Sequence, residues 1–193
     1  MSVDWSKLGH TLGECYHDSE KSCTYVNIPK NASSFIKGCL LGTGKFEYSN
    51  TMISAETYLV ALRDPVERWC SGMSQFIKNN NDMSILDAVE KITWDDHTEQ
   101  QIYFIKNIDH DKTVFFLVDS NFSKNLQSWL DQQDYRANCN DNTYSNSSDQ
   151  QGTTELKKRL ILDVDSNESI KLKLLNHYKQ DIDLINRVKF YGI

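Results

Sequence analysis

The 193-residue sequence lacks several features that define large classes of proteins. No apolar run approaches the roughly 20 residues that span a bilayer, and the polar start, MSVDWSKLGH, has no signal-peptide core. The only two prolines are Pro29 and Pro65, which excludes a Pro-rich linker or a collagen-like chain. We therefore expect a single cytoplasmic domain over residues 1–193, with no membrane partner.

Cysteine and basic residues are also scarce. The five cysteines are an odd number at irregular spacing, which argues against a disulfide framework and favours reduced thiols. Lys and Arg total 21 against 27 Asp and Glu, so the formal net charge is −6. We do not expect so acidic a chain to bind nucleic acid through a broad basic surface. Any anion site must be local.

Short apolar runs and helical patterns alternate along the chain. Runs rich in Val, Tyr, Phe and Ile predict buried strands at Thr24–Ile28, Tyr58–Leu62 and Thr113–Val118. Apolar residues at helical spacing predict helices at Ser33–Leu41, Pro65–Ile77, Ser123–Leu130 and Ser169–Val188. This order is typical of an α/β fold, in which helices flank a central parallel sheet.

The first candidate site follows the first predicted strand, in the sequence IPKNASSF at residues 28–35. Small and hydroxyl residues at such a junction let backbone N–H groups approach an anion at the positive end of a helix, and Lys30 adds a charge. The plain alternative is an ordinary turn with Ser33 as the helix N-cap. A Walker A motif is absent, and GTGKF at 42–46 fits a helix C-cap, so a kinase-like enzyme is disfavoured.

The second candidate site follows the second predicted strand. Arg63 stands where that strand ends, and Ser71 lies two turns into the next helix on its polar side, together with Asp64, Arg68 and Gln75. A guanidinium and a hydroxyl so placed can hold a phosphate by charge-assisted hydrogen bonds. With Lys30, the two arginines would form the local anion site. The alternative is a solvated face with a structural Arg–Asp pair.

Together these segments resemble the PAPS-dependent sulfotransferases, most closely the Golgi-type carbohydrate O-sulfotransferases (PAPS is 3′-phosphoadenosine 5′-phosphosulfate). In that family P-K-x-x-[SG]-[ST]-[ST] binds the 5′-phosphosulfate and R-D-P-x-x-R-x-x-S binds the 3′-phosphate. The chain offers PKNASS at 29–34 and RDPVERWCS at 63–71. Two further segments extend the resemblance: His97 and Gln101 match an H-x-x-x-Q segment, and YKQDI at 178–182 resembles the closing Y-x-x-D-[IYF] helix.

The resemblance implies a three-layer, P-loop NTPase-like sulfotransferase fold and transfer of a sulfuryl group from PAPS to an acceptor hydroxyl, with a carbohydrate as the expected acceptor. It assigns Lys30 to the leaving oxygen, His97 to the acceptor's proton, and Glu99 or Glu56 as reserve bases; no metal is expected. The implied cofactor-binding residues are Pro29, Lys30, Asn31, Ala32, Ser33, Ser34, Arg63 and Ser71. The P-x-P-like substrate elements and the membrane anchor of larger members are missing, which favours a short soluble version.

Several alternatives stay open. A non-catalytic sulfotransferase-like domain would bind a phosphorylated nucleotide or a protein partner. His97 also fits a surface histidine in a polar helix start. A metal site at His10, Cys15, His17 and Cys23 matches no common zinc spacing. The Asn/Ser-rich stretch at 138–152 predicts a long loop, either a lid over the cofactor with contacts from Asn142 and Ser145 or a disordered segment.

Overall fold

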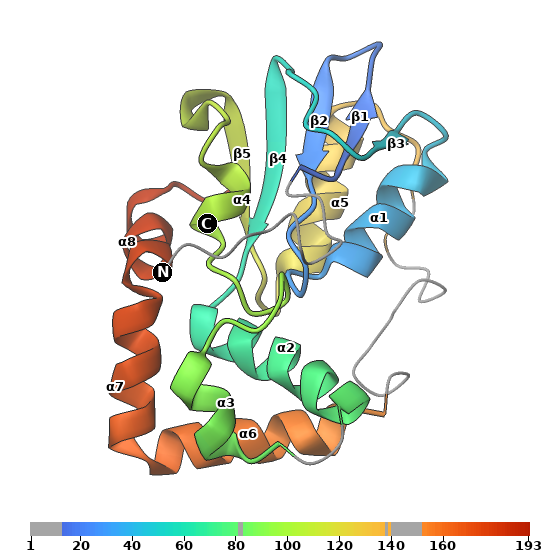
Figure 1. Cartoon of the computed structure of the whole chain (residues 1–193). Helices are drawn as coiled ribbons and strands as arrows, with labels where there is room; N and C mark the ends of the chain where they lie inside the picture. The colour runs from blue at the N-terminus through green and yellow to red at the C-terminus, as the bar shows by residue number, and fades with distance from the viewer. Residues whose placement is uncertain (1–12, 81–82, 138, 140–151) are drawn as a thin grey trace.

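A five-stranded mixed sheet forms the centre of the computed structural model, which describes residues 13–80, 83–137, 139 and 152–193 (Figure 1). The strand order is β3-β1-β2-β4-β5. Strand β2 pairs parallel with β4, and β4 with β5, whereas β1 pairs antiparallel with both β2 and β3. The strands are β1 (Cys15–Asp18), β2 (Cys23–Val26), β3 (Glu47–Ser49), β4 (Thr57–Leu62) and β5 (Thr113–Leu117).

The three predicted strands are confirmed as β2, β4 and β5, with both ends of β2 and one end each of β4 and β5 moved by one or two residues. The expectation of a parallel sheet is wrong at one edge, because β1 and β3 were not predicted and β1 runs antiparallel to its neighbours. Both missed strands are short and carry polar residues, CYHD and EYS, so neither shows the apolar run of a buried strand.

The helices are α1 (Ser33–Gly42), α2 (Pro65–Asn80), α3 (Ile85–Lys91), α4 (Ile102–Ile105), α5 (Phe122–Gln132), α6 (Thr154–Ser166), α7 (Glu168–His177) and α8 (Lys179–Arg187). Three predicted helices are confirmed as α1, α2 and α5. The single helix predicted at Ser169–Val188 is two helices, α7 and α8, which meet at Tyr178. The break occurs where Tyr178 bonds to another segment, as described below.

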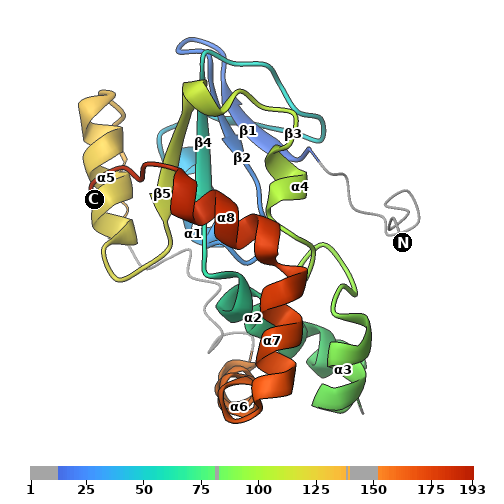
Figure 2. The same cartoon turned by 90° about the vertical axis from the view of Figure 1, so that its left-hand side faces the viewer.

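Helices cover both faces of the sheet (Figure 2). Along β4, Leu59 and Ala61 pack in the cluster that contains α1 and α5. The alternate residues Tyr58, Val60 and Leu62 pack in the cluster that contains α4 and α8. Side chains of a strand point alternately to opposite faces, so a strand that is apolar at every position is buried on both sides.

A third apolar cluster joins α2, α3, α6 and α7 below the sheet in Figure 1, at the edge where the parallel strands end. Trp69, Cys70 and Met73 of α2 are fully buried there against Leu160 and Val164 of α6. Burial of a large apolar side chain such as that of Met73 stabilises the fold by about 1.5–3 kcal/mol. The cluster fixes the position of α2 below the loops that follow β2 and β4 in Figure 1.

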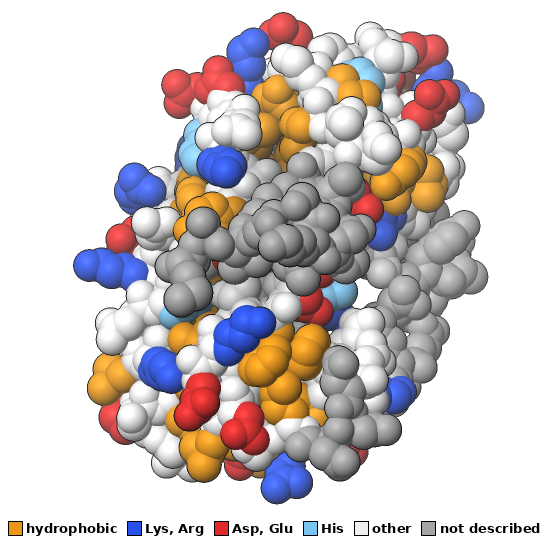
Figure 3. Space-filling view, viewed as in Figure 1, with side chains coloured by type: hydrophobic (Ala, Val, Ile, Leu, Met, Phe, Trp, Pro, Cys, Tyr) orange, Lys and Arg blue, Asp and Glu red, His pale blue; other side chains and the backbone are white. Residues whose placement is uncertain are grey.

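On the face shown in Figure 3, the described acidic and basic side chains are interspersed around the rim, without one broad basic area. This arrangement agrees with the net charge of −6. None of the helices in the described part of the chain combines the length and the apolar character needed to cross a membrane.

Candidate functional site

The loop that leaves β2 has an unusual backbone. Lys30 and Ala32 both adopt left-handed conformations, with φ of 68° and 56°. Such values cost free energy in residues other than glycine and cluster at functional sites. Ala32 is the N-cap of α1 and supplies no side-chain hydrogen bond, so Ser33 is the first helical residue rather than the cap. The N-cap side chain therefore offers no hydrogen bond to the first N–H groups of α1, which have no partner within the helix.

Arg68 holds this loop from below. Its guanidinium lies in the interior, 1% exposed, and donates from Nε to the Pro29 carbonyl at 3.0 Å and from Nη2 to the Asp96 carbonyl at 2.9 Å. Nη1 donates to the Glu99 carbonyl. The expectation that Arg68 belongs to the anion site is therefore wrong: each of its nitrogens is bonded to a backbone carbonyl, and the side chain does not reach the surface.

Gln101 joins the loops after β2 and β4. Its Oε1 accepts from Asn31 Nδ2 at 2.6 Å and from the Arg63 backbone N–H at 3.0 Å. Its Nε2 donates to the Arg63 carbonyl at 2.9 Å, so the amide pairs with both backbone groups of that residue. Asn31 Nδ2 also donates to the Ala61 carbonyl at 2.7 Å. Asn31 and Gln101 are fully buried, where polar atoms generally need such partners, although Asn31 Oδ1 has none among the described residues.

Asp181 of α8 secures Gln101 in turn. Its carboxylate accepts from the Gln101 N–H at 2.8 Å and from the Ile102 N–H at 2.9 Å. Burial raises the pKa of Asp181, while these N–H donors oppose the shift. The hydroxyl of Tyr178 donates to the Thr98 carbonyl. These two contacts place α7 and α8 at an angle and explain why the helix breaks at Tyr178.

Lys30 is partly exposed and reaches from the loop after β2 to α2. Its ammonium donates to Oε1 of Gln75 on α2. Burial lowers the pKa of Lys30, and the negative charges of Asp95 and Asp96 oppose that shift. The side chain is thus a partly desolvated cation on the loop that precedes α1, where its field acts more strongly than in water.

Arg63 spans the space between the first loop and α2. Its Nη1 donates to the Lys30 carbonyl at 3.3 Å, and its Nη2 pairs with Glu67 at 3.1 Å. Its Nε is buried and has no hydrogen-bond partner among the residues that the structure describes. Burial lowers the pKa of Lys157 on α6, and the positive charge of Arg63 lowers it further, whereas the negative charge of Glu67 opposes the shift. Ser71 is 9% exposed on the same helix as Glu67.

His97 is held by two carboxylates. Its Nδ1 lies 3.1 Å from Asp95 Oδ2 and 3.0 Å from Asp96 Oδ1. Burial lowers the pKa of His97, but the bonds to the two carboxylates outweigh it and raise the pKa to about 9. The imidazole therefore carries a proton at neutral pH. Its assignment as the catalytic base stays a prediction, and that role first requires loss of this proton.

The two reserve bases lie in different places. Glu99 is 3% exposed, and its Oε1 accepts from the Gln100 N–H at 2.7 Å; burial raises its pKa. Glu56 precedes β4 and pairs with Lys112 at 3.0 Å. That position is at the amino end of β4, whereas Arg63 follows its carboxyl end, so Glu56 lies at the wrong edge of the sheet to serve the site.

The predicted metal alternative finds no support in the described residues. Cys15 Sγ donates to the Thr51 carbonyl at 3.3 Å, and His17 Nδ1 lies 2.8 Å from Thr24 Oγ1. His10 lies outside the described residues, as do Asn142, Ser145 and most of the 138–152 stretch. Within the described ranges, the one cluster with metal-ligand atoms close together is Asp95, Asp96 and His97, which the imidazole–carboxylate bonds already account for.

Gly72 is a site residue that the sequence analysis missed. A Cβ at this position of α2 would lie 2.5 Å from the His97 carbonyl oxygen, closer than real contacts allow. The glycine thus lets the turn that carries His97 pack directly on the helix backbone. An isolated glycine inside a helical pattern was the available signal, since such a residue often marks a close approach.

Comparisons with protein-family models, with curated proteins and with solved structures found no match to this chain. The geometry carries the functional argument. The segments at 29–34, 63–71, 96–101 and 178–182 are far apart in the sequence but are joined by hydrogen bonds in the fold.

Proposed function

We propose that the chain is a sulfotransferase with a P-loop-like sulfotransferase fold, which moves the sulfuryl group of PAPS to an acceptor hydroxyl, with a carbohydrate as the expected acceptor. One observation carries the proposal. The four segments that resemble sulfotransferase motifs, at 29–34, 63–71, 96–101 and 178–182, are joined by the bonds of Asn31, Arg68, Gln101 and Asp181.

The residues present suit a donor with two phosphate-bearing ends. The start of α1, where the N-cap Ala32 gives no side-chain hydrogen bond, and the Lys30 ammonium suit the 5′-phosphosulfate end, since a helix N-terminus offers N–H donors and positive potential. The unpartnered Nε of Arg63 and the nearby Lys157 suit the 3′-phosphate, because guanidinium groups bind phosphate through several donors. ATP has no 3′-phosphate, so this second subsite would favour PAPS.

PAPS supplies an activated sulfuryl group, and the protein supplies position and charge. Lys30 would face the charge that builds on the leaving oxygen, where a preorganised cation is worth more than in water. The left-handed backbone at Lys30 and Ala32 turns this loop around the start of α1. Pro29 is fixed from below by Arg68, so the loop needs little reorganisation on binding.

A nucleotide-binding domain without transfer is the second candidate, and the state of His97 favours it. A histidine that two carboxylates keep protonated does not accept a proton at neutral pH. If His97 is the base, transfer should increase as the pH rises toward 9, because only the neutral imidazole accepts the acceptor's proton. If transfer is absent at every pH while binding persists, the second candidate is correct.

Binding is tested first, by thermal denaturation with adenosine 3′,5′-bisphosphate. A ligand that binds the native state raises the melting temperature, and ATP should raise it much less. Arg63→Ala should weaken bisphosphate binding about tenfold or more, the usual loss for a hydrogen bond to a charged group. Lys112→Ala, an exposed cation at the opposite edge of the sheet, is the matched control and should bind normally. Absence of any shift for the wild-type protein contradicts both candidates.

Transfer is tested next, with labelled PAPS and a panel of glycans and small alcohols. The wild-type protein should label a sugar hydroxyl. Lys30→Ala should lower transfer much more than it weakens bisphosphate binding, because the charge of Lys30 contacts the 5′ end of the donor and also acts on the leaving oxygen in the transition state. A Lys30→Ala variant that transfers at the wild-type rate would show that the assignment of Lys30 is wrong.

A further inference from the structure

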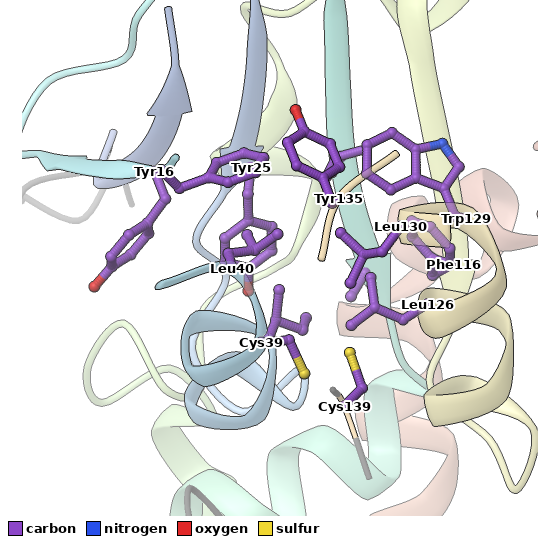
Figure 4. Packing of buried hydrophobic residues seen from close by; sticks show 14 of the residues in the cluster. Tyr16, Tyr25, Cys39, Leu40, Phe116, Leu126, Trp129, Leu130, Tyr135 and Cys139 are labelled. Atoms are coloured by element: carbon purple, nitrogen blue, oxygen red, sulfur yellow. The ribbon is translucent and has the colours of Figure 1, made fainter. Parts of the chain in front are cut away.

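Two cysteines that the proposed function does not use face each other in the interior. Cys39 lies on α1, and Cys139 lies beyond the end of α5, one hundred positions later in the sequence. Figure 4 shows their sulfur atoms pointing toward each other between the two helices. They are 6% and 2% exposed, and each thiol shifts the pKa of the other.

Both cysteines are held in place by their surroundings. The Cys139 N–H donates to Gln127 Oε1 at 2.8 Å, and Gln127 Nε2 donates to the Ala137 carbonyl at 2.9 Å. Gln127 therefore ties this segment to α5. Cys39 is packed beside Leu40, which is fully buried in the same apolar cluster. The facing arrangement thus follows from two independently fixed elements.

The contact also makes the two sulfurs chemically unequal. The interaction with Cys139 and burial both raise the pKa of the Cys39 thiol. The interaction with Cys39 lowers the pKa of Cys139, although burial opposes the shift. Cys139 is therefore the sulfur that more readily becomes a thiolate, which is the form that oxidants attack.

We propose that Cys39 and Cys139 form a disulfide on oxidation and so act as a redox-dependent staple between α1 and the segment that follows α5. Hydrogen peroxide is small enough to be the oxidant for so buried a pair. The Cys139 thiolate attacks one peroxide oxygen, becomes a sulfenic acid, and releases hydroxide, which takes up a proton to give water. Cys39 sulfur then displaces the sulfenic oxygen as a second water. The sum is two thiols and one peroxide to one disulfide and two waters.

The other three cysteines are unsuited to this reaction. Burial raises the pKa of Cys15, and it raises the pKa values of Cys23 and Cys70 to about 12, so their thiolates are suppressed. Cys15 and Cys23 lie on paired strands, but their register partners are Val26 and Asp18, so they do not face each other. The proposal therefore names one pair among five thiols.

The staple is independent of the sulfotransferase proposal and is tested on the whole chain. The protein is treated with hydrogen peroxide, its remaining thiols are blocked with an alkylating agent, and it is digested with trypsin without reduction. We expect peptide 38–45 linked to peptide 137–157, and a fall from five free thiols to three. Cys139 carrying sulfinic acid with no linked peptide, or a link to Cys15, Cys23 or Cys70, overturns the proposal.

Variants provide the second measurement. The oxidised wild-type protein should unfold at a higher denaturant concentration than the reduced protein, because a disulfide between distant residues restricts the unfolded chain. Cys139→Ser should lose both this difference and the linked peptide, whereas Cys70→Ser should keep the link. An equal midpoint for oxidised and reduced wild-type protein contradicts a stabilising staple. The peptide map of the wild-type protein stands even if a variant fails to fold.

Discussion

At the residue scale, the two arginines of the segment at 63–71 have different roles. Arg63 and Arg68 stand five residues apart, and the sequence placed both in an anion site. The structure leaves Arg63 Nε without a partner among the described residues, while Arg68 is bonded to carbonyls of Pro29, Asp96 and Glu99. A buried charge is tolerated only when its donors are satisfied. The partners lie about thirty or more positions away, so local spacing did not reveal them.

His97 makes stability depend on pH. Burial lowers the pKa of His97, yet Asp95 and Asp96 raise it from 6.5 to about 9 in the folded protein. The contribution of His97 to the free energy of unfolding is complete below pH 6.5 and is lost as the pH rises through 9. The shift corresponds to about 3 kcal/mol of unfolding free energy. Urea unfolding at these two pH values should show that loss in the wild-type protein.

His97→Gln should remove most of this pH dependence, since glutamine does not titrate. His110→Gln, at an exposed histidine near the start of β5, is the control and should keep it. Equal losses in the wild-type protein and in His97→Gln would contradict the assignment of the raised pKa to His97.

At the element scale, some helix starts were predictable, whereas α3, α4 and α6 and the contacts between helices were not. The start of α2 follows from Asp64 and Pro65, and the Asp64 carboxylate accepts the Glu67 N–H at 2.8 Å as a cap requires. The break between α7 and α8 has no local signal, because the apolar spacing continues through Tyr178. It is imposed by bonds from Tyr178 and Asp181 to a segment some eighty positions earlier.

Gly72→Ala tests the packing of α2 against the turn that carries His97. Alanine favours a helix over glycine by about 0.5–1 kcal/mol. Here a Cβ would meet backbone, the His97 carbonyl oxygen at 2.5 Å, and backbone does not rotate away. We therefore expect a net destabilisation of about 1–3 kcal/mol, as for other overpacked sites.

Gly42→Ala is the matched control, because it is the last residue of α1 and a Cβ there meets open space. Chemical denaturation should show a lower free energy of unfolding for Gly72→Ala and an equal or higher one for Gly42→Ala, each compared with the wild-type protein. A Gly72→Ala variant as stable as the wild-type protein would show that the turn moves freely and that the glycine is not required for the close approach.

At the scale of the whole molecule, the sequence predicted the three strands that pair in parallel, β2, β4 and β5, but not β1 and β3 on the other side of the sheet. Buried strands such as β4 are apolar at successive positions and are recognisable, whereas β1 and β3 are short and partly polar. The candidate site is also a property of the whole chain. Motif residues suggested which segments matter, but the bonds of Gln101 to Asn31, Arg63 and Asp181 depend on the completed fold.

The shared network predicts a shared response to ligand. Gln101 bonds to the loops after β2 and β4, and its backbone N–H donates to Asp181 of α8. A ligand that makes one of these segments more rigid should therefore restrain the other segments as well. Adenosine 3′,5′-bisphosphate should therefore slow amide hydrogen exchange at 28–34, 63–71, 96–102 and 178–182 together, while α5 changes little. Protection confined to 28–34 would contradict the coupling. In that outcome this acidic chain would bind its anion through the loop at 28–34 alone, without the other three segments.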